Sequence, residues 1–161
     1  MIVLENNLND IQELALIAKT QDVNTDLILM ICGKKLGQGY SRVCYEYNLD
    51  NRYVVKIEPQ NTDSNRAEFL LWYEIQGLKG KFAWVKEWFA PIKYCSPNGK
   101  ILIMQRTKQD FKKTRPNKVP AFFMDVKPDN FGWIGNRFVC HDYGSIYRFI
   151  KYEKKFQDVE W

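Results

Sequence analysis

The sequence predicts an α+β protein, and two observations carry this prediction. Three pairs of short apolar runs each flank a turn-forming segment, which indicates β-hairpins over 44–58, 92–105 and 131–144. Between the first two hairpins, residues 67–76 place apolar side chains at helical spacing. Strand pairs that precede and follow a central helix are typical of the α+β class.

The chain is expected to begin with two helices before its first strand. Apolar residues recur at helix spacing over 8–18 with polar residues between them. A second short helix fits the segment from Thr25, a candidate N-cap, to Gly33, a residue suited to a helix C-terminus. Residues 1–35 are therefore expected to form an N-terminal helical segment.

The remaining elements follow from turn and helix-end signals. A strand from Leu36 leads through a glycine-containing turn into the first hairpin, which turns at 49–51. The central helix is expected to start after Ser64 and to end at Gly77. A Gly-Asn pair at 135–136 provides the turn of the third hairpin.

Composition narrows the class of protein. The length of 161 residues suits a single domain, and 45% hydrophobic with 27% charged residues excludes an intrinsically disordered chain. The longest apolar stretch, 27–32, is too short to cross a bilayer, and the first ten residues carry no secretory pattern. We therefore expect no membrane association and a cytoplasmic location. Four cysteines without a CxxC pair and a single histidine argue against zinc and indicate reduced thiols.

Gly37 and Gly39 lie between two expected strands and precede a lysine on the next hairpin. Such a glycine pair usually marks a tight bend, and the segment matches neither a Walker A loop nor a dinucleotide fingerprint. Lys56 ends the apolar run YVVKI, and a lysine facing inward from a buried strand is costly unless it meets an anion. The alternative is that Lys56 lies on the solvent face of a half-exposed strand.

The central helix carries two carboxylates that could hold the Lys56 ammonium in place for phosphate oxygens. Glu68 shares a helical face with apolar neighbours, and Glu74 shares a different face with others. Periodicity alone therefore leaves both residues open as the partner of Lys56.

The strongest signal is the segment from Asp125 to Asn130, followed by Asp142-Tyr143-Gly144 after the third hairpin. This hairpin is expected to bring Asn130 and Asp142 to the same end, where oxygen ligands suit magnesium. Asp125 is then placed to accept or orient a hydroxyl, and Lys127 to neutralise a transferred phosphoryl group. Taken singly, each part also has an ordinary explanation, because Pro-Asp-Asn is a common turn.

Taken in order, these residues resemble the signature of eukaryotic-type protein kinases over residues 37–144. Motif details such as LGQGYSR also resemble small kinase-like proteins of bacteria and bacteriophages. The resemblance implies Asp125 and Lys127 as catalytic residues and Asn130 and Asp142 as magnesium ligands. It implies a larger ATP-binding set: Gly37, Gly39, Arg42, Cys44, Val54, Lys56, Glu68, Met104, Gln105 and Arg106. Here Glu68 is preferred over Glu74, and residues 104–106 correspond to the gatekeeper and hinge.

The sequence departs from the kinase pattern at several positions. Arg42 replaces the third glycine of the loop, which indicates either a stiffer loop or an arginine that reaches a phosphate. Phe123-Met124 replaces the usual His-Arg before the catalytic aspartate, so control by a phosphorylated activation loop is not expected. Only seventeen residues follow Gly144. The implied fold is therefore a minimal kinase-like one, with a five-stranded antiparallel N-lobe, one helix and a vestigial C-lobe.

This resemblance predicts one compact unit with an N-lobe over 36–107 and a reduced C-lobe over 108–161. The expected function is an ATP- and Mg²⁺-dependent phosphotransferase that acts on serine or threonine hydroxyls of a host protein or of the chain itself. The alternatives are a kinase-like binding module that inhibits or redirects a host protein, and a small-molecule kinase. A basic stretch, 106–118, carries six basic residues against one acid; a solvated linker is favoured there over a nucleic-acid contact. The sequence does not indicate an oligomeric state.

Overall fold

The computed structural model describes residues 12, 16, 24–146 and 153–161. The helix expected over 8–18 therefore lies almost wholly outside the described residues. The chain divides into two compact units. We call Met1–Asn65 with Ile92–Arg106 the sheet unit, and Arg66–Pro91 with Thr107–Trp161 the hairpin unit.

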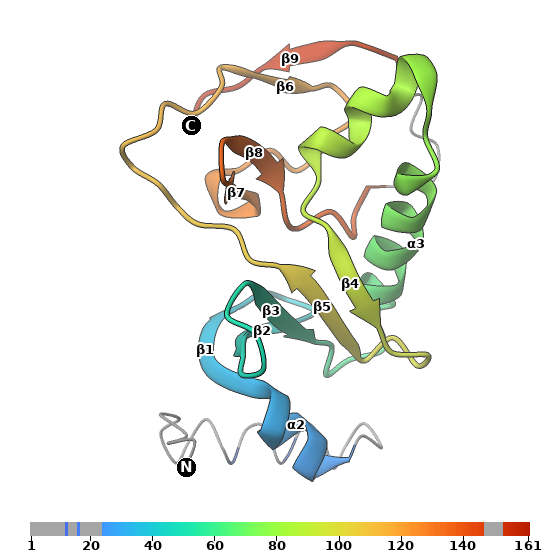
Figure 1. The fold of residues 1–161 in the computed structure, drawn as a ribbon, viewed down its shortest axis with the longest axis vertical. Helices are drawn as coiled ribbons and strands as arrows, with labels where there is room; N and C mark the ends of the chain where they lie inside the picture. Colours follow the sequence, from blue (N-terminus) through green and yellow to red (C-terminus); the bar gives the residue numbers. More distant parts are fainter. Residues whose placement is uncertain (1–11, 13–15, 17–23, 147–152) are drawn as a thin grey trace. The chain divides into compact units, whose positions relative to one another are not determined.

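The sheet unit contains a five-stranded antiparallel sheet (Figure 1). Its strands run in the order β1-β2-β3-β5-β4, and each neighbouring pair is antiparallel. The bounds are β1 (Cys32–Gln38), β2 (Val43–Tyr47), β3 (Tyr53–Ile57), β4 (Ile92–Cys95) and β5 (Ile101–Gln105). The predicted α+β class, the five-stranded antiparallel sheet and the first two hairpins are confirmed.

A short helix, α2 (Thr25–Ile31), precedes the sheet and is shorter than predicted. Its N-cap is Asn24 rather than Thr25, because the Asn24 Oδ1 accepts the backbone N–H of Leu27 at 3.1 Å. The helix stops before Gly33 because Cys32 already has extended backbone angles and begins β1.

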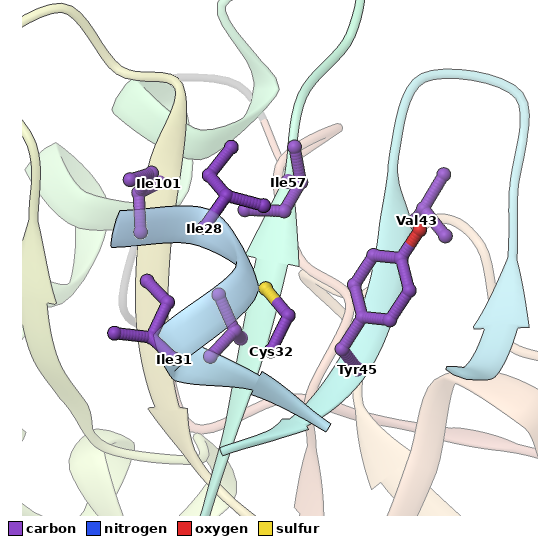
Figure 2. Close-up of a cluster of buried hydrophobic side chains, with 8 residues drawn as sticks. Ile28, Ile31, Cys32, Val43, Tyr45, Ile57 and Ile101 are labelled. Atoms are coloured by element: carbon purple, nitrogen blue, oxygen red, sulfur yellow. The ribbon is translucent and has the colours of Figure 1, made fainter. Parts of the chain in front are cut away.

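One face of the sheet packs against α2. Ile28 and Ile31 from α2 gather with apolar side chains of four strands in the cluster drawn in Figure 2. The strand residues of this cluster are Cys32, Val43, Tyr45, Val55, Ile57 and Ile101. Burial, with a smaller contribution from Cys44, raises the pKa of the Cys32 thiol to about 12, so this thiol stays protonated. All four cysteines are free thiols, as expected.

Helix α3 (Ser64–Gln76) forms where the sequence predicts the central helix. Its first two residues belong to the sheet unit and the remainder to the hairpin unit. A 3₁₀ helix, η1 (Gly80–Trp88), follows it in a region where no helix or strand is predicted from the sequence. Within the described part of the chain, no helix has both the length and the apolar character needed to span a bilayer.

The hairpin unit is organised around the predicted third hairpin, β7 (Phe131–Ile134) and β8 (Arg137–Cys140). A second strand pair, β6 (Lys118–Pro120) with β9 (Phe156–Asp158), joins segments far apart in the sequence (Figure 1). The interior is a chain of aromatic rings with centroids 4.8–6.0 Å apart. Its members include Trp84, Phe89, Phe122, Phe123, Phe131, Phe138, Tyr143 and Trp161. Edge-to-face and offset ring pairs of this kind hold a small unit together.

Candidate functional site

Lys56 lies on the face of the sheet opposite α2. In an antiparallel sheet, directly paired residues point to the same face. Lys56 pairs with Cys44 on β2 and Leu102 on β5, and Val54 on the same strand pairs with Met104. Four of the predicted ATP-binding residues, Cys44, Val54, Lys56 and Met104, therefore share one face.

Lys56 is only 6% exposed, so the alternative of a solvent-facing lysine does not hold. Val54 and Met104 are also buried beside it. This face therefore combines apolar side chains, which suit an aromatic base, with one cation, which suits a phosphate.

Gly37 lies near the end of β1, and Gly39 begins the turn between β1 and β2. Gly37 pairs with Cys44, and the Gly39 N–H donates to the carbonyl oxygen of Arg42 at 2.9 Å. A Cβ added at Gly37 would meet nothing within 4 Å, and one at Gly39 would come no closer than 3.9 Å to another atom. Neither residue needs glycine for its own backbone conformation. What the two glycines provide is open space, since no side chain projects from either position where a ligand could approach the backbone.

The expected hinge is only partly available to a base. Gln105 ends β5 opposite Tyr53, and the backbone N–H of Arg106 already donates to the carbonyl oxygen of Arg52 at 2.8 Å. The Arg106 side chain forms an ion pair with Glu46 at 3.0 Å. Within the sheet unit, Arg106 therefore stabilises the end of the sheet.

The hairpin unit brings three residues of the predicted catalytic loop together. The Nζ of Lys127 lies 3.0 Å from the Oδ2 of Asp125. The Nδ2 of Asn130 donates to that same Oδ2 and to the backbone oxygen of Asp125, both at 2.9 Å. The Asp125 side chain is nevertheless 52% exposed, so its carboxylate is open to solvent.

These contacts fix the charge states of the loop. Hydrogen bonds from Lys127 and then from Asn130 hold the pKa of Asp125 below its ordinary value of 3.8. The Asp125 carboxylate in turn raises the pKa of Lys127 above its ordinary value of 10.5. At neutral pH the loop therefore presents an ionised carboxylate beside an ammonium group.

Asn130 and Asp142 flank the same end of the third hairpin, as the sequence predicts. A short 3₁₀ helix, η2 (Pro128–Asn130), leads into β7, and the His141 N–H donates to the Asn130 carbonyl at 2.8 Å. The two ring nitrogens of His141 lie 2.9 Å from the carbonyl oxygen of Asp129 and from the Thr107 hydroxyl. His141 therefore stabilises the end of the third hairpin at which Asn130 and Asp142 lie.

The donor set at this end fits magnesium. Asn130 supplies an amide oxygen and Asp142 a carboxylate, and the Asn130 amide nitrogen is held by Asp125. Magnesium is commonly held by one or two protein oxygens together with the phosphates of a substrate. Among the described residues, no cluster of three or more His, Cys, Asp or Glu forms a metal cage of protein groups alone.

The structure distinguishes the two helix carboxylates. Glu68 is fully buried, whereas Glu74 is exposed. The Oε1 of Glu68 accepts the backbone N–H groups of Tyr143 at 2.8 Å and Gly144 at 3.2 Å. Glu68 therefore holds the turn that follows Asp142, a contact that sequence reasoning missed.

Tyr143 is anchored on its other side as well. Its hydroxyl donates to the backbone oxygen of Ala90 at 2.8 Å, and its ring packs edge-on against Phe89. The turn that carries Asp142 is thus fixed through both the backbone and the side chain of Tyr143.

The basic stretch 106–118 is a structured segment. Lys113 lies over the Trp133 ring and forms an ion pair with Asp110, and Arg115 lies over the Trp161 ring. Lys118 at its end pairs with an aspartate of β9. Four of its six cations contact other groups of the protein, so the stretch is more ordered than the solvated linker that the sequence favours.

Comparison with known proteins gave one distant likeness. No family model matches the chain, and no curated protein matches it. A solved structure described as a streptomycin–ATP–APH(2")-IIa ternary complex aligns with a TM-score of 0.37 and 20% identity. The alignment covers 65% of this chain and 30% of that chain, so this chain spans less than a third of the length of its structural neighbour. A function for the chain must therefore be inferred from its own residues.

Proposed function

We propose that the chain is an ATP- and Mg²⁺-dependent phosphotransferase of the kinase type. The observation that carries this proposal is the catalytic-loop geometry, in which Lys127 and Asn130 both contact the exposed carboxylate of Asp125. An ionised, oriented carboxylate next to a cation is what transfer to a hydroxyl requires, because this chemistry depends on positioning and charge neutralisation.

Each unit contributes one part of the proposed chemistry. In the sheet unit, Cys44, Val54 and Met104 contact the base, while Lys56 and the turn from Gly37 to Arg42 bind phosphate oxygens. In the hairpin unit, Asp125 orients the acceptor hydroxyl and receives its proton as the new oxygen–phosphorus bond forms and the bond from the γ-phosphorus to the departing ADP breaks.

Charge on the transferred group is balanced by residues of the hairpin unit. Lys127 leaves its ion pair with Asp125 to contact the phosphoryl oxygens, which frees the carboxylate for the hydroxyl. Asn130 and Asp142 are the residues that would hold magnesium, which would neutralise the remaining phosphate charge. Glu68 keeps Asp142 in place through the backbone of the following turn.

The acceptor we propose is a serine or threonine hydroxyl on a host protein or on the chain itself. Asp125 supports a hydroxyl acceptor because its exposed carboxylate can accept a hydrogen bond from an alcohol and orient it as it attacks. Its half-exposed position lets an acceptor on a folded protein reach it.

The acceptor is tested with purified chain, γ-labelled ATP and magnesium, incubated alone, with bacterial lysate and with small alcohols that include an aminoglycoside. We expect label on protein, at phosphoserine or phosphothreonine identified by mass spectrometry. Label on the small alcohols instead would replace the protein acceptor with a small-molecule one. If the Asp125→Asn variant captures the same lysate proteins as the wild type and neither protein transfers label, the chain is a binding module.

A further inference from the structure

A buried polar network ties the start of α3 to the strand that carries Lys56. All of its members belong to the sheet unit. Its two central residues are Glu58, 2% exposed, and Asn65, fully buried. Buried polar groups are costly unless their hydrogen bonds are satisfied, so the contacts of these two residues show what the network holds in place.

Glu58 holds the first turn of α3 in position by accepting hydrogen bonds from its backbone. Its Oε2 accepts the backbone N–H of Asn65 at 2.9 Å, and its Oε1 accepts that of Thr62 at 2.7 Å. Its own N–H donates to the carbonyl oxygen of Lys100 at 3.0 Å. A carboxylate at a helix N-terminus is stabilised by the backbone N–H groups and by the helix dipole. Glu58 therefore fixes Asn65 relative to the end of β3.

Asn65 uses that fixed position to hold two other segments. Its Nδ2 donates to the carbonyl oxygen of Lys56 at 3.2 Å and to that of Lys100 at 3.3 Å. Its Oδ1 accepts the guanidinium Nη1 of Arg42 at 3.4 Å. One buried side chain thus contacts the backbone of the predicted phosphate-binding lysine and the cation of the glycine-containing turn.

The contact with Arg42 is long and its acceptor is a neutral amide. A guanidinium bonds a phosphate more strongly than it bonds an amide, so Arg42 can exchange this contact for a phosphate oxygen at little cost. An arginine held in this way is already oriented when the ligand arrives, which reduces the cost of ordering it.

We propose that Asn65, seated by Glu58, is a positioning residue that presents Arg42 and Lys56 to the triphosphate of a nucleotide. This inference rests on the proposed function. It assigns a role to Arg42, which stands where the kinase loop has its third glycine. It also assigns a role to Asn65 of α3, which is not one of the residues of the kinase signature.

The control is another asparagine of the same unit. Asn48 also donates its Nδ2 to two backbone carbonyls, those of Met30 and Cys32, both at 3.2 Å. Asn48→Ala and Asn65→Ala therefore remove comparable amide contacts, but only Asn65 contacts Arg42. Arg42→Ala removes the other partner of the same hydrogen bond, from a partly exposed residue.

The first measurement is Mg-ATP affinity by calorimetry on the full chain. Arg42→Ala and Asn65→Ala are each expected to weaken binding about tenfold, the effect of losing one bond to a charged group. The double variant should lose less affinity than the sum of the two single losses, because part of the effect of Asn65 acts through Arg42. Asn48→Ala should bind within about twofold of the wild type.

The second measurement is amide hydrogen exchange of the ligand-free protein, which does not depend on any activity. Asn65→Ala should speed exchange over 39–43, whereas Asn48→Ala should not. Wild-type failure to bind Mg-ATP would overturn the proposed function and the nucleotide role together. Wild-type binding with unchanged affinity in Arg42→Ala, or with fully additive losses in the double variant, would overturn the Asn65 inference alone. Unchanged exchange over 39–43 in Asn65→Ala would overturn it as well.

Discussion

Replacement of Glu68 tests whether this buried carboxylate holds the turn after Asp142. Glu68→Ala removes the acceptor of two backbone N–H groups and leaves that of Tyr143 buried without its partner. The 2.8 Å bond to a charged acceptor is worth about 2 kcal/mol and the longer bond about 1 kcal/mol. We therefore expect the free energy of unfolding to fall by about 3 kcal/mol. Glu68→Gln keeps a neutral acceptor oxygen, so about half of that loss is expected.

The assay is urea denaturation followed by circular dichroism, with Glu74→Ala as the matched control from the exposed side of the same helix. That control should stay within about 0.5 kcal/mol of the wild type. In a thermal scan, Glu68→Ala should melt about 6–12 °C lower. A Glu68→Ala protein as stable as Glu74→Ala would refute the assignment, because the two backbone N–H groups would then have no need of the carboxylate.

Three further predictions concern the hairpin unit. Tyr143→Phe removes the bond to the Ala90 carbonyl and should cost about 1 kcal/mol in the free energy of unfolding. Gly132→Ala places a Cβ 2.8 Å from the Thr107 side chain, so overpacking should cost about 1–3 kcal/mol in the same denaturation assay. The pKa of Asp125 is lowered in the folded state, so its stabilisation is present above the unfolded pKa of about 3.9 and is lost as the pH falls through the folded value. Below about pH 4, wild-type unfolding free energy should therefore fall more steeply than that of Asp125→Asn, as measured by denaturation across a pH series.

Each of these predictions has a control in the chain. Tyr73→Phe alters an exposed tyrosine of α3, and Gly37→Ala adds a Cβ where no atom lies within 4 Å. Neither control should change the free energy of unfolding by more than about 0.5 kcal/mol. Losses in the controls as large as those in the test variants would contradict the contacts assigned here. If the free energy of unfolding falls equally steeply at acidic pH in the wild type and in Asp125→Asn, the lowered pKa of Asp125 is contradicted.

Local signals in the sequence predicted the elements that depend on local chemistry. The three hairpins form where turn residues interrupt apolar runs, and α3 spans the predicted helix. The loop from Asp125 to Asn130 and the return of the chain to Asp142 also follow from spacing, because a tight hairpin brings its two ends together.

Tertiary contacts decided what the sequence left open or missed. Periodicity gave Glu68 and Glu74 equal standing, and only the packing of α3 shows which one is buried. The pairing of β6 with β9 joins three-residue strands more than thirty residues apart, which no local pattern reveals. The role of Asn65 could not be predicted from the sequence, since it depends on the carbonyl groups of Lys56 in β3 and of Lys100 just before β5.

The central claim is tested most directly by γ-phosphoryl transfer from Mg-ATP in four proteins with matched melting temperatures. They are the wild type, Asp125→Asn, Asp142→Asn and the control Asp129→Asn, an exposed carboxylate of the same loop whose backbone oxygen, which the variant keeps, contacts His141. We expect transfer in the wild type and in Asp129→Asn, and a loss of at least about a hundredfold in the other two, the usual scale for removing a group that acts in the transition state. Equal transfer in all four proteins, or none in the wild type, would contradict the account.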